Sequence, residues 1–177
     1  MKNINMSHFG SLPVRIAAVA VMAMTFCLSP SAEAKLKEGQ EFPTLKVSGF
    51  PGKPKVDASK YKGKVVIVDF WASWCEPCKV ELPALNKLHK KYKGKVVVIG
   101  VNVDEKIDDA KSFLKDHPVG FDLVHDKKQA VAGELGIEKM PTSFILSDGK
   151  IVKVHEAFRE GDEKKIEAEI KKLLAGG

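Results

Sequence analysis

The feature that most constrains this chain is an apolar run that leads straight into two closely spaced cysteines. Residues 64–70 are rich in β-branched side chains, which is typical of a strand buried on both faces. The run continues as Trp-Ala-Ser-Trp-Cys-Glu-Pro-Cys, ending at Cys75 and Cys78. A helical pattern follows, with Pro83 inside it, where the missing backbone donor predicts a kink. The segment therefore predicts a buried strand, a turn carrying both cysteines, and a helix.

The rest of the chain alternates between strand and helix patterns. In chain order we expect a helix from Cys75 or Glu76 to about Tyr92, a strand from Lys95 to Val103, a helix from Ile107 to His117, a strand from Gly120 to Val124, a helix from Lys127 to Leu135, strands Ser143–Leu146 and Ile151–His155 joined by an Asp-Gly turn, and a final helix capped by Asp162. The lead from Lys35 to Pro54 reads as loop with a small strand pair. This order predicts one layered α/β domain over residues 35–177.

Residues 1–34 have the features of an export signal. A basic start, including Arg15, precedes an apolar stretch at residues 16–28, and Ala32-Glu33-Ala34 forms a small-residue cleavage site. The apolar stretch is short for a bilayer span. We expect cleavage after Ala34. The alternatives are retention as an N-terminal membrane anchor and lipid attachment at Cys27, which the bulky Phe26 disfavours.

Removal of the signal leaves Cys75 and Cys78 as the cysteines of the mature chain. In an oxidising compartment such a pair forms a disulfide, but a bridge across so short a loop restrains the unfolded chain little. A structural zinc site would need two further ligands, which the sequence does not supply at the usual spacing. Covalent haem attachment would need His after the second cysteine, where Lys79 stands. The pair therefore indicates a redox centre that works without a bound cofactor.

The expected chemistry follows from a cysteine at the start of a helix. Free backbone N–H groups and the helix dipole stabilise the thiolate, which is the nucleophile in disulfide exchange. We expect Cys75 to be the exposed attacking residue and Cys78 the buried resolving residue, with Pro77 stiffening the bridge. Trp71 and Trp74 either shield the pair and form an apolar docking surface, or pack in the core.

Two acidic residues are candidates for proton transfer. Asp69 ends the apolar strand, where an aspartate is costly unless it has a partner or a role. Glu81 lies three residues after Cys78 and so shares its face of the helix. Either could exchange a proton with Cys78. The alternative for each is a hydrogen-bonded or solvated carboxylate without a catalytic role.

The charge balance is basic, with 29 Lys and Arg against 23 Asp and Glu. The lysines alternate with apolar residues at helical spacing, which favours solvated helix faces over a nucleic-acid-binding stripe. We therefore expect no nucleic-acid partner, although a weak preference for anionic partners stays open.

The stretch Val-Asp-Phe-Trp-Ala-Ser-Trp-Cys-Glu-Pro-Cys-Lys resembles the active site of the thioredoxin superfamily, with Asp69, Trp74 and Pro83 at the expected offsets. The signal, Tyr61-Lys62-Gly63-Lys64 and the Cys-Glu-Pro-Cys-Lys-x-Glu-x-Pro pattern resemble the exported TlpA/ResA-like group. The resemblance implies a thioredoxin fold, a central mixed sheet flanked by helices, with an N-terminal extension and a helix–strand insertion at residues 104–126. It also implies a substrate-binding surface of Trp74, Glu76, Pro77 and a cis-proline loop, Met140, Pro141 and Thr142. This group often has Asn in place of Asp69.

The leading hypothesis is a periplasmic thiol–disulfide oxidoreductase that reduces protein disulfides through Cys75 and Cys78. A membrane protein would supply its electrons, the chain would act as a monomer, and a role in cytochrome c maturation rests on analogy alone. A thiol peroxidase is the second hypothesis, although such enzymes usually carry Thr where this chain has Ala72. A third is a non-catalytic binding module that uses the tryptophan-rich surface.

Overall fold

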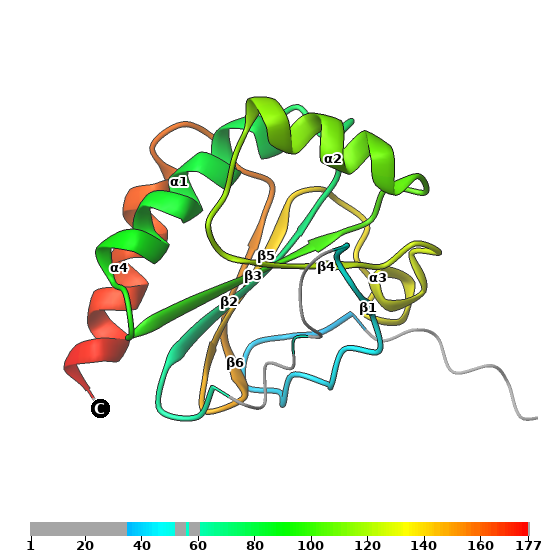
Figure 1. The fold of residues 1–177 in the computed structure, drawn as a ribbon. Helices are drawn as coiled ribbons and strands as arrows, with labels where there is room; N and C mark the ends of the chain where they lie inside the picture. Colours follow the sequence, from blue (N-terminus) through cyan, green and yellow to red (C-terminus); the bar gives the residue numbers. More distant parts are fainter. Residues whose placement is uncertain (1–34, 52–55, 57–60, 177) are drawn as a thin grey trace, which may run out of the picture. The chain divides into compact units, whose positions relative to one another are not determined.

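The computed structural model describes residues 35–51, 56 and 61–176, which form a mixed sheet with helices packed on it (Figure 1). The predicted signal peptide and Cys27 lie outside the described residues. In chain order the elements are β1 (Ser48–Gly49), β2 (Val65–Trp71), α1 (Cys78–Lys91), β3 (Val96–Asn102), α2 (Ile107–Asp116), β4 (Asp122–His125), α3 (Ala130–Glu134), β5 (Thr142–Ser147), β6 (Lys150–Glu156) and α4 (Asp162–Ala175). The expected alternation of strands and helices is confirmed.

The sheet has six strands in the order β1-β4-β3-β2-β5-β6. β2, β3 and β4 are parallel, while β5 pairs antiparallel with β2, β6 with β5, and β1 with β4. All seven residues of β2 are buried, as its β-branched run predicts. Because β2 lies inside the sheet, the segment that follows it emerges at the carboxyl end of a central strand, where α/β proteins commonly place their sites.

The two faces of the sheet are covered by different segments. Right-handed crossovers from β2 to β3 and from β3 to β4 place α1 and α2 on one face, and Trp71 of β2 contacts Phe113 of α2 with ring centroids 5.3 Å apart. α4 lies beside α1 on this face (Figure 1). On the opposite face Phe144 of β5 packs against Phe42 of the N-terminal lead, with centroids 5.3 Å apart. Both faces are therefore buried by apolar packing.

Several boundaries differ from the predictions for local reasons. α3 is shorter than the expected 127–135, because the Asp126 carboxylate accepts the N–H groups of Ala130 and Ala132 and fixes the start of the helix. α4 begins at Asp162, so this residue is not its N-cap. Its carboxylate instead accepts the N–H of Arg159 in the preceding turn. β4 begins two residues later than predicted.

The N-terminal lead does not form the expected strand pair. β1 pairs with β4 at one edge of the sheet, and Glu41 forms an isolated bridge with Lys150 at the other. The lead therefore extends both edges of the sheet rather than pairing with itself. The segment 104–126 supplies α2 and β4, which confirms the helix–strand insertion that the resemblance implied.

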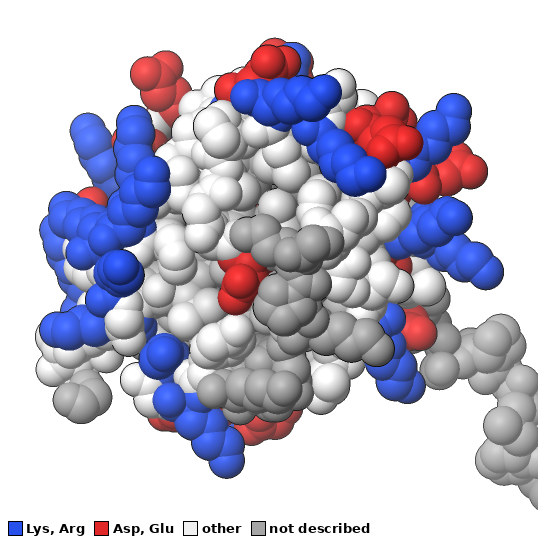
Figure 2. Space-filling model, in the orientation of Figure 1, with Lys and Arg blue, Asp and Glu red and all other residues white. Residues whose placement is uncertain are grey.

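Charged side chains are unevenly spread over the surface. Lys and Arg gather at the left of Figure 2, the side on which α1 and α4 lie in Figure 1. They are interleaved with acids there: Glu167 of α4 forms ion pairs with Lys91 at 2.8 Å and with Lys171 at 3.2 Å. The lysines are therefore solvated helix residues, several of them paired, as their spacing predicts.

Candidate active site

The two cysteines lie in the turn that joins β2 to α1. β2 ends at Trp71, and α1 begins at Cys78 with Pro77 as the preceding residue. The Sγ atoms are joined in a disulfide with the Cα atoms 5.3 Å apart. The backbone N–H of Cys78 donates to Sγ of Cys75 over 3.3 Å. An N–H group at the helix start thus points at the first sulfur, as expected for a site that stabilises a thiolate.

Two details of this turn correct the predictions. The helix begins at Cys78 rather than at Cys75 or Glu76, because the intervening residues form a turn closed by the Cys78 N–H and the Cys75 carbonyl at 3.2 Å. The prediction of an exposed Cys75 is wrong for the disulfide form, in which Cys75 is 3% exposed and Cys78 0%. Cys75 is still the outer member of the pair, so a partner must approach from its side.

Both predicted carboxyls meet at a single hydroxyl. Asp69 of β2 pairs directly with Ser143 of β5, and directly opposite residues of antiparallel strands project to the same face. α1 covers this face and brings in Glu81. Oγ of Ser143 lies 2.9 Å from Oδ1 of Asp69 and 2.8 Å from Oε1 of Glu81. Both carboxyls are buried, and their second oxygens have no hydrogen-bond partner among the described residues.

This environment favours protonated carboxyls. Burial raises the pKa of Asp69 to about 7, against hydrogen bonds with Ser143 and Glu81 that lower it. Burial, and then the negative charge of Asp69, raise the pKa of Glu81 well above its usual range. A carboxyl with the pKa of Asp69 can accept and release a proton near neutral pH, as an acid–base group for a thiol must.

A second polar network holds the turn before the cysteines. The carboxylate of Asp104, at the end of β3, accepts the backbone N–H of Ser73 at 3.0 and 3.1 Å and the Ser73 hydroxyl at 2.9 Å. It also accepts Nδ2 of Asn102 at 2.7 Å, and the Asp104 carbonyl is 2.7 Å from Nε2 of His125. Because Ser73 stands two residues before Cys75, these bonds fix where the first cysteine lies.

The two tryptophans have different environments. Trp71 is fully buried and packs against Phe113, so it belongs to the core and gives no docking surface. Trp74 is 64% exposed and lies next to Cys75 in the chain. Trp74 is therefore exposed where the sequence suggested a docking surface, whereas Trp71 packs in the core.

The remaining predicted substrate-binding residues have mixed exposure. Glu76 is exposed and pairs with Lys79 at 2.6 Å, while Pro77 is half-buried. The Met140–Pro141 peptide bond is cis, as the resemblance implied. Met140 is half-buried, whereas Pro141 and Thr142 are buried.

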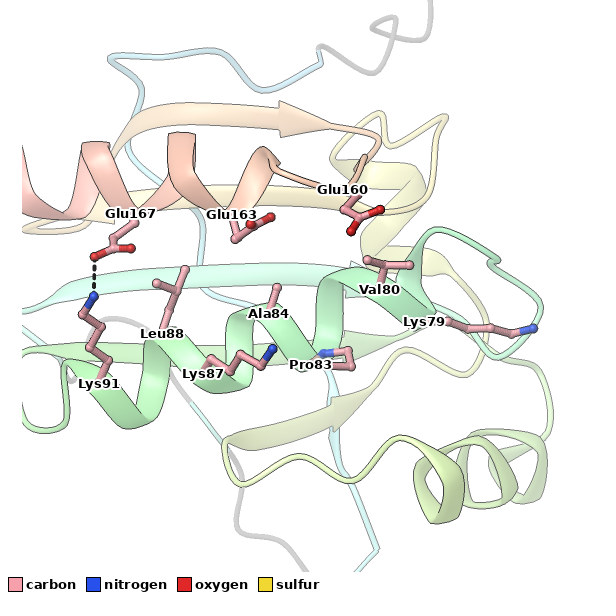
Figure 3. Close-up of a pocket in the computed structure, with 10 residues that line it drawn as sticks. All are labelled: Lys79, Val80, Pro83, Ala84, Lys87, Leu88, Lys91, Glu160, Glu163 and Glu167. Carbon is pink, nitrogen blue, oxygen red and sulfur yellow. Dashed lines mark hydrogen bonds and ion pairs between the residues drawn. The ribbon is translucent and has the colours of Figure 1, made fainter.

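A groove between α1 and α4 begins beside the second cysteine. Its volume is about 540 Å³ and its lining comprises Lys79, Val80, Pro83, Ala84, Lys87, Leu88, Lys91, Glu160, Glu163 and Glu167 (Figure 3). α1 supplies an apolar floor with lysines beside it, and the acids come from α4 and the loop before it. Val80, two residues after Cys78, is 50% exposed. The groove therefore has an exposed apolar residue at its end nearest in sequence to Cys78.

Sequence reasoning missed Ser143 and Asp104. Ser143 is hidden in an apolar strand pattern, although a buried serine among apolar residues predicts a polar partner. Asn102 ends a buried strand and Asp104 lies two residues later, and polar residues at the carboxyl end of a strand are a recognisable signal. The contacts themselves join residues far apart in the chain, which spacing alone does not reveal.

Metal sites and membrane-spanning helices are two other features that such a chain can carry. Over residues 35–51, 56 and 61–176, no three His, Cys, Asp or Glu side chains are grouped so as to hold a metal ion. No helix in this part of the chain has both the length and the apolar character needed to cross a membrane.

Comparison with known proteins identifies relatives over most of the chain. Residues 38–155 match the model of the AhpC/TSA family. The chain is 36% identical over 141 residues to the thiol-disulfide oxidoreductase ResA of Bacillus thuringiensis (strain Al Hakam), covering 78% of this chain and 80% of the relative. It is 33% identical over 126 residues to ResA of Bacillus subtilis (strain 168), covering 70% of each.

Solved structures give the same result. A protein from Chlorobium tepidum described as a thiol:disulfide interchange protein DsbE superposes with a TM-score of 0.74 at 36% identity, covering 79% of this chain and 99% of the other. A protein described as a disulfide isomerase from Bacteroides thetaiotaomicron superposes with a TM-score of 0.70 at 27% identity, covering 79% and 91%. These similarities confirm the thioredoxin fold.

Thioredoxin-like oxidoreductases exchange electrons with protein substrates through a cysteine pair and need no bound cofactor. The matched family model spans most of the described residues, and the relatives have one activity in common. The chain therefore belongs to the AhpC/TSA family of thioredoxin-like proteins and is a thiol–disulfide oxidoreductase.

Proposed function

We propose that the chain is an exported enzyme that reduces protein disulfides through Cys75 and Cys78. The observation that carries this proposal is the Cys75–Cys78 disulfide at the start of α1, with Glu81 on the same helix face as Cys78 and Asp69 beside it. The pair supplies a nucleophile and a resolving thiol, and the carboxyls supply an acceptor for a proton.

The reaction starts from the dithiol form. The Cys75 thiolate attacks one sulfur of a substrate disulfide, forming a mixed disulfide and releasing the other substrate sulfur as a thiolate. Cys78 loses its proton and attacks Sγ of Cys75, which forms the Cys75–Cys78 bond and releases the second substrate thiolate. The two electrons of the dithiol thereby pass to the substrate. Glu81 and Asp69 accept the Cys78 proton during the second step.

The direction of electron flow is proposed from the residues between the cysteines. Glu76 and Pro77 give an acidic, rigid bridge, whereas a histidine there would stabilise the thiolate further and favour oxidation. A reductase returns to the dithiol only if another protein supplies electrons. Outside the cytoplasm we propose a membrane donor for this step, and apocytochrome c as one candidate substrate.

A protein substrate needs a surface beside the disulfide. We propose that Trp74 and Val80 contact apolar side chains that flank the substrate cysteine, and that Met140, Pro141 and Thr142 contact its backbone. Exposed large apolar residues are common at protein interfaces, where aromatic groups contribute most.

Export is proposed from the sequence of residues 1–34, which the structure does not describe. Cleavage after Ala34 would release a domain of residues 35–177 that acts as a monomer in the periplasm; retention would anchor the same domain to the membrane. N-terminal sequencing of the protein recovered from the exported fraction distinguishes these two outcomes.

The catalytic proposal is tested by reduction of a protein disulfide by the purified dithiol form, with insulin as substrate. C75S should reduce the rate to background, because the attacking sulfur is lost. C78S should accumulate a mixed disulfide with the substrate, which non-reducing electrophoresis detects. Unchanged turnover in C75S contradicts the proposal. So does consumption of hydrogen peroxide faster than insulin reduction, which would identify a thiol peroxidase.

A further inference from the structure

One hydroxyl lies between two buried carboxyls, and its hydrogen count restricts their protonation. A serine hydroxyl has one hydrogen and donates one full hydrogen bond at a time. Oγ of Ser143 is nevertheless 2.9 Å from Oδ1 of Asp69 and 2.8 Å from Oε1 of Glu81, and both distances suit an O–H···O bond. If the hydroxyl donates to one carboxyl, a proton on the other carboxyl must donate back to Oγ.

The burial of both carboxyls also indicates that one of them carries a proton. Asp69 is 0% exposed and Glu81 1% exposed. Two ionised carboxylates this close in an apolar interior repel one another, and a buried charge without a counter-charge is costly. The cluster therefore holds at least one proton in the disulfide form of the protein.

We propose that Ser143 relays a proton between Glu81 and Asp69, so that the two carboxyls serve Cys78 as one acid–base unit. The proposal rests on the proposed function, since it names the proton acceptor of the same site. Ser143 is a positioning residue here: it acts through the carboxyls and not on the sulfur atoms.

The relay explains how Glu81 can accept the proton of Cys78 in the resolving step. Glu81 is the carboxyl on the Cys78 face of α1, but a protonated Glu81 cannot accept a proton. In the relay the Glu81 proton passes to Oγ of Ser143 while the Ser143 hydrogen passes to Oδ1 of Asp69. Glu81 is then a carboxylate and accepts the proton of Cys78 as the Cys75–Cys78 bond forms. Both carboxyls end protonated, and one proton later leaves to solvent.

The groups around the cluster do not supply a competing counter-charge. His155 of β6 pairs directly with Ser143 and so projects to the same face, but burial lowers its pKa and favours the neutral ring. Asp162 at the start of α4 adds negative charge, which raises the pKa of Glu81. On β3, Gly100 pairs with Asp69 and contributes no side chain.

Carbon-13 NMR of the Asp69 and Glu81 carboxyl carbons, recorded against pH on the disulfide form, tests the relay without substrate. The wild type should keep one proton on the pair at pH 7, and both carbons should report the same two titration steps, as coupled groups do. S143A removes the hydroxyl between the carboxyls but not the repulsion of their charges, so both carbons should still report coupled steps, at pKa values shifted from those of the wild type. S143T, which keeps a hydroxyl, should restore the wild-type steps.

D69N and E81Q give a second test that does not depend on the folding of S143A. Each amide resembles a protonated carboxyl and can still donate to Oγ of Ser143. In D69N the remaining Glu81 carboxyl should titrate in one step, with its pKa lower by more than about one unit because the charge of Asp69 is gone. In E81Q the Asp69 carboxyl should likewise titrate in one step. Two ionised carboxyls at pH 7 in the wild type would overturn the proposal, as would titration steps in S143A identical to those of the wild type.

A kinetic measurement links the cluster to the reaction. The mixed disulfide of Cys75 with thionitrobenzoate releases a coloured thiolate when Cys78 attacks, so the resolving step is observed directly. S143A should slow this release by a factor approaching the roughly 10²-fold loss expected of E81Q, while S143T retains most of the rate. Equal rates in S143A and wild type contradict the relay. If the NMR result holds and insulin is not reduced, the proposed function fails while the shared proton stands.

Discussion

At the scale of single residues, the site is built by burying groups that would be more stable in water. Asp69 and Glu81 share one hydroxyl, and the second oxygen of each carboxyl has no hydrogen-bond partner among the described residues. Such burial costs free energy of folding once the carboxyls ionise. The site therefore trades stability at neutral and higher pH for acid–base groups that titrate in the working range.

D69N is predicted to change how stability depends on pH. The folded-state pKa of Asp69, about 7, lies above its usual value of 3.8. The destabilisation by the ionised Asp69 carboxylate is therefore absent below pH 4 and grows until pH 7. Three pKa units correspond to about 4 kcal/mol. D69N should therefore be more stable than wild type at pH 8 by up to about that amount and similar to it at pH 3.5, as measured by urea unfolding of the disulfide form.

D162N is the matched control for this prediction. Hydrogen bonds with Lys165 and with the backbone of Arg159 lower the pKa of Asp162, so its contribution is present above pH 4 and is lost as pH falls. The D162N protein should therefore lose stability at pH 8, whereas D69N should gain stability at this pH. Parallel stability curves for D69N and wild type between pH 4 and 8 would contradict the role of burial at Asp69.

At the scale of elements, the ends of neighbouring strands hold the turn that carries the disulfide. β2 ends at Trp71, and Asp104 lies two residues after the end of β3, which runs parallel to β2. Asp104 binds the backbone and the hydroxyl of Ser73. A turn fixed in this way keeps the two sulfurs close, and this favours the disulfide over the dithiol.

D104A is predicted to raise the reduction potential of the Cys75–Cys78 couple. Without the carboxylate the Ser73 turn is less restrained, the disulfide is less favoured, and the potential rises by about 30 mV for each 1.4 kcal/mol lost. Equilibration with dithiothreitol measures it. D126N is the control, since Asp126 instead binds N–H groups of α3, and it should leave the potential unchanged. A wild-type potential in D104A would show that Asp104 has no influence on the pair.

G100A is predicted to destabilise the contact between β3 and the core. A Cβ at Gly100 would lie 2.8 Å from Leu123, 3.0 Å from Trp71 and 3.1 Å from Phe121, too close for packed side chains. The expected loss is about 1–3 kcal/mol in urea unfolding. G133A is the control, because a Cβ there meets nothing within 4 Å and helix propensity favours alanine. Equal stability of G100A and wild type would mean that the core shifts freely.

At the scale of the whole molecule, the sequence predicts most of the scaffold and part of the site. β2 and β3 are long apolar runs and α1 has a clear helical period, so local pattern places them well. The predicted start of α1 is too early, because the sequence of the turn around Glu76 has a helix-like composition. The convergence of Asp69 and Glu81 on Ser143 joins positions 74 and 62 residues apart, which are brought together by the register of β2 with β5 and by the packing of α1 on the sheet.

W74A is predicted to weaken recognition of protein substrates without harming the chemistry. Trp74 is exposed beside the disulfide, so its loss should raise KM for insulin by about tenfold, in line with a truncated interface aromatic. Reduction of a small disulfide such as dithionitrobenzoate should change little. K172A, which replaces an exposed lysine near the end of α4, serves as control. An unchanged KM in W74A would place substrate docking elsewhere.

The reduction potential of the Cys75–Cys78 couple tests the proposed direction of electron flow most directly. Trp71 lies at the end of β2 and Trp74 next to Cys75, so tryptophan fluorescence can report the redox state in defined mixtures of dithiothreitol and of glutathione. A reductase predicts a value near that of thioredoxin, about −270 mV, whereas a value near that of DsbA, about −120 mV, would contradict the account and indicate disulfide formation.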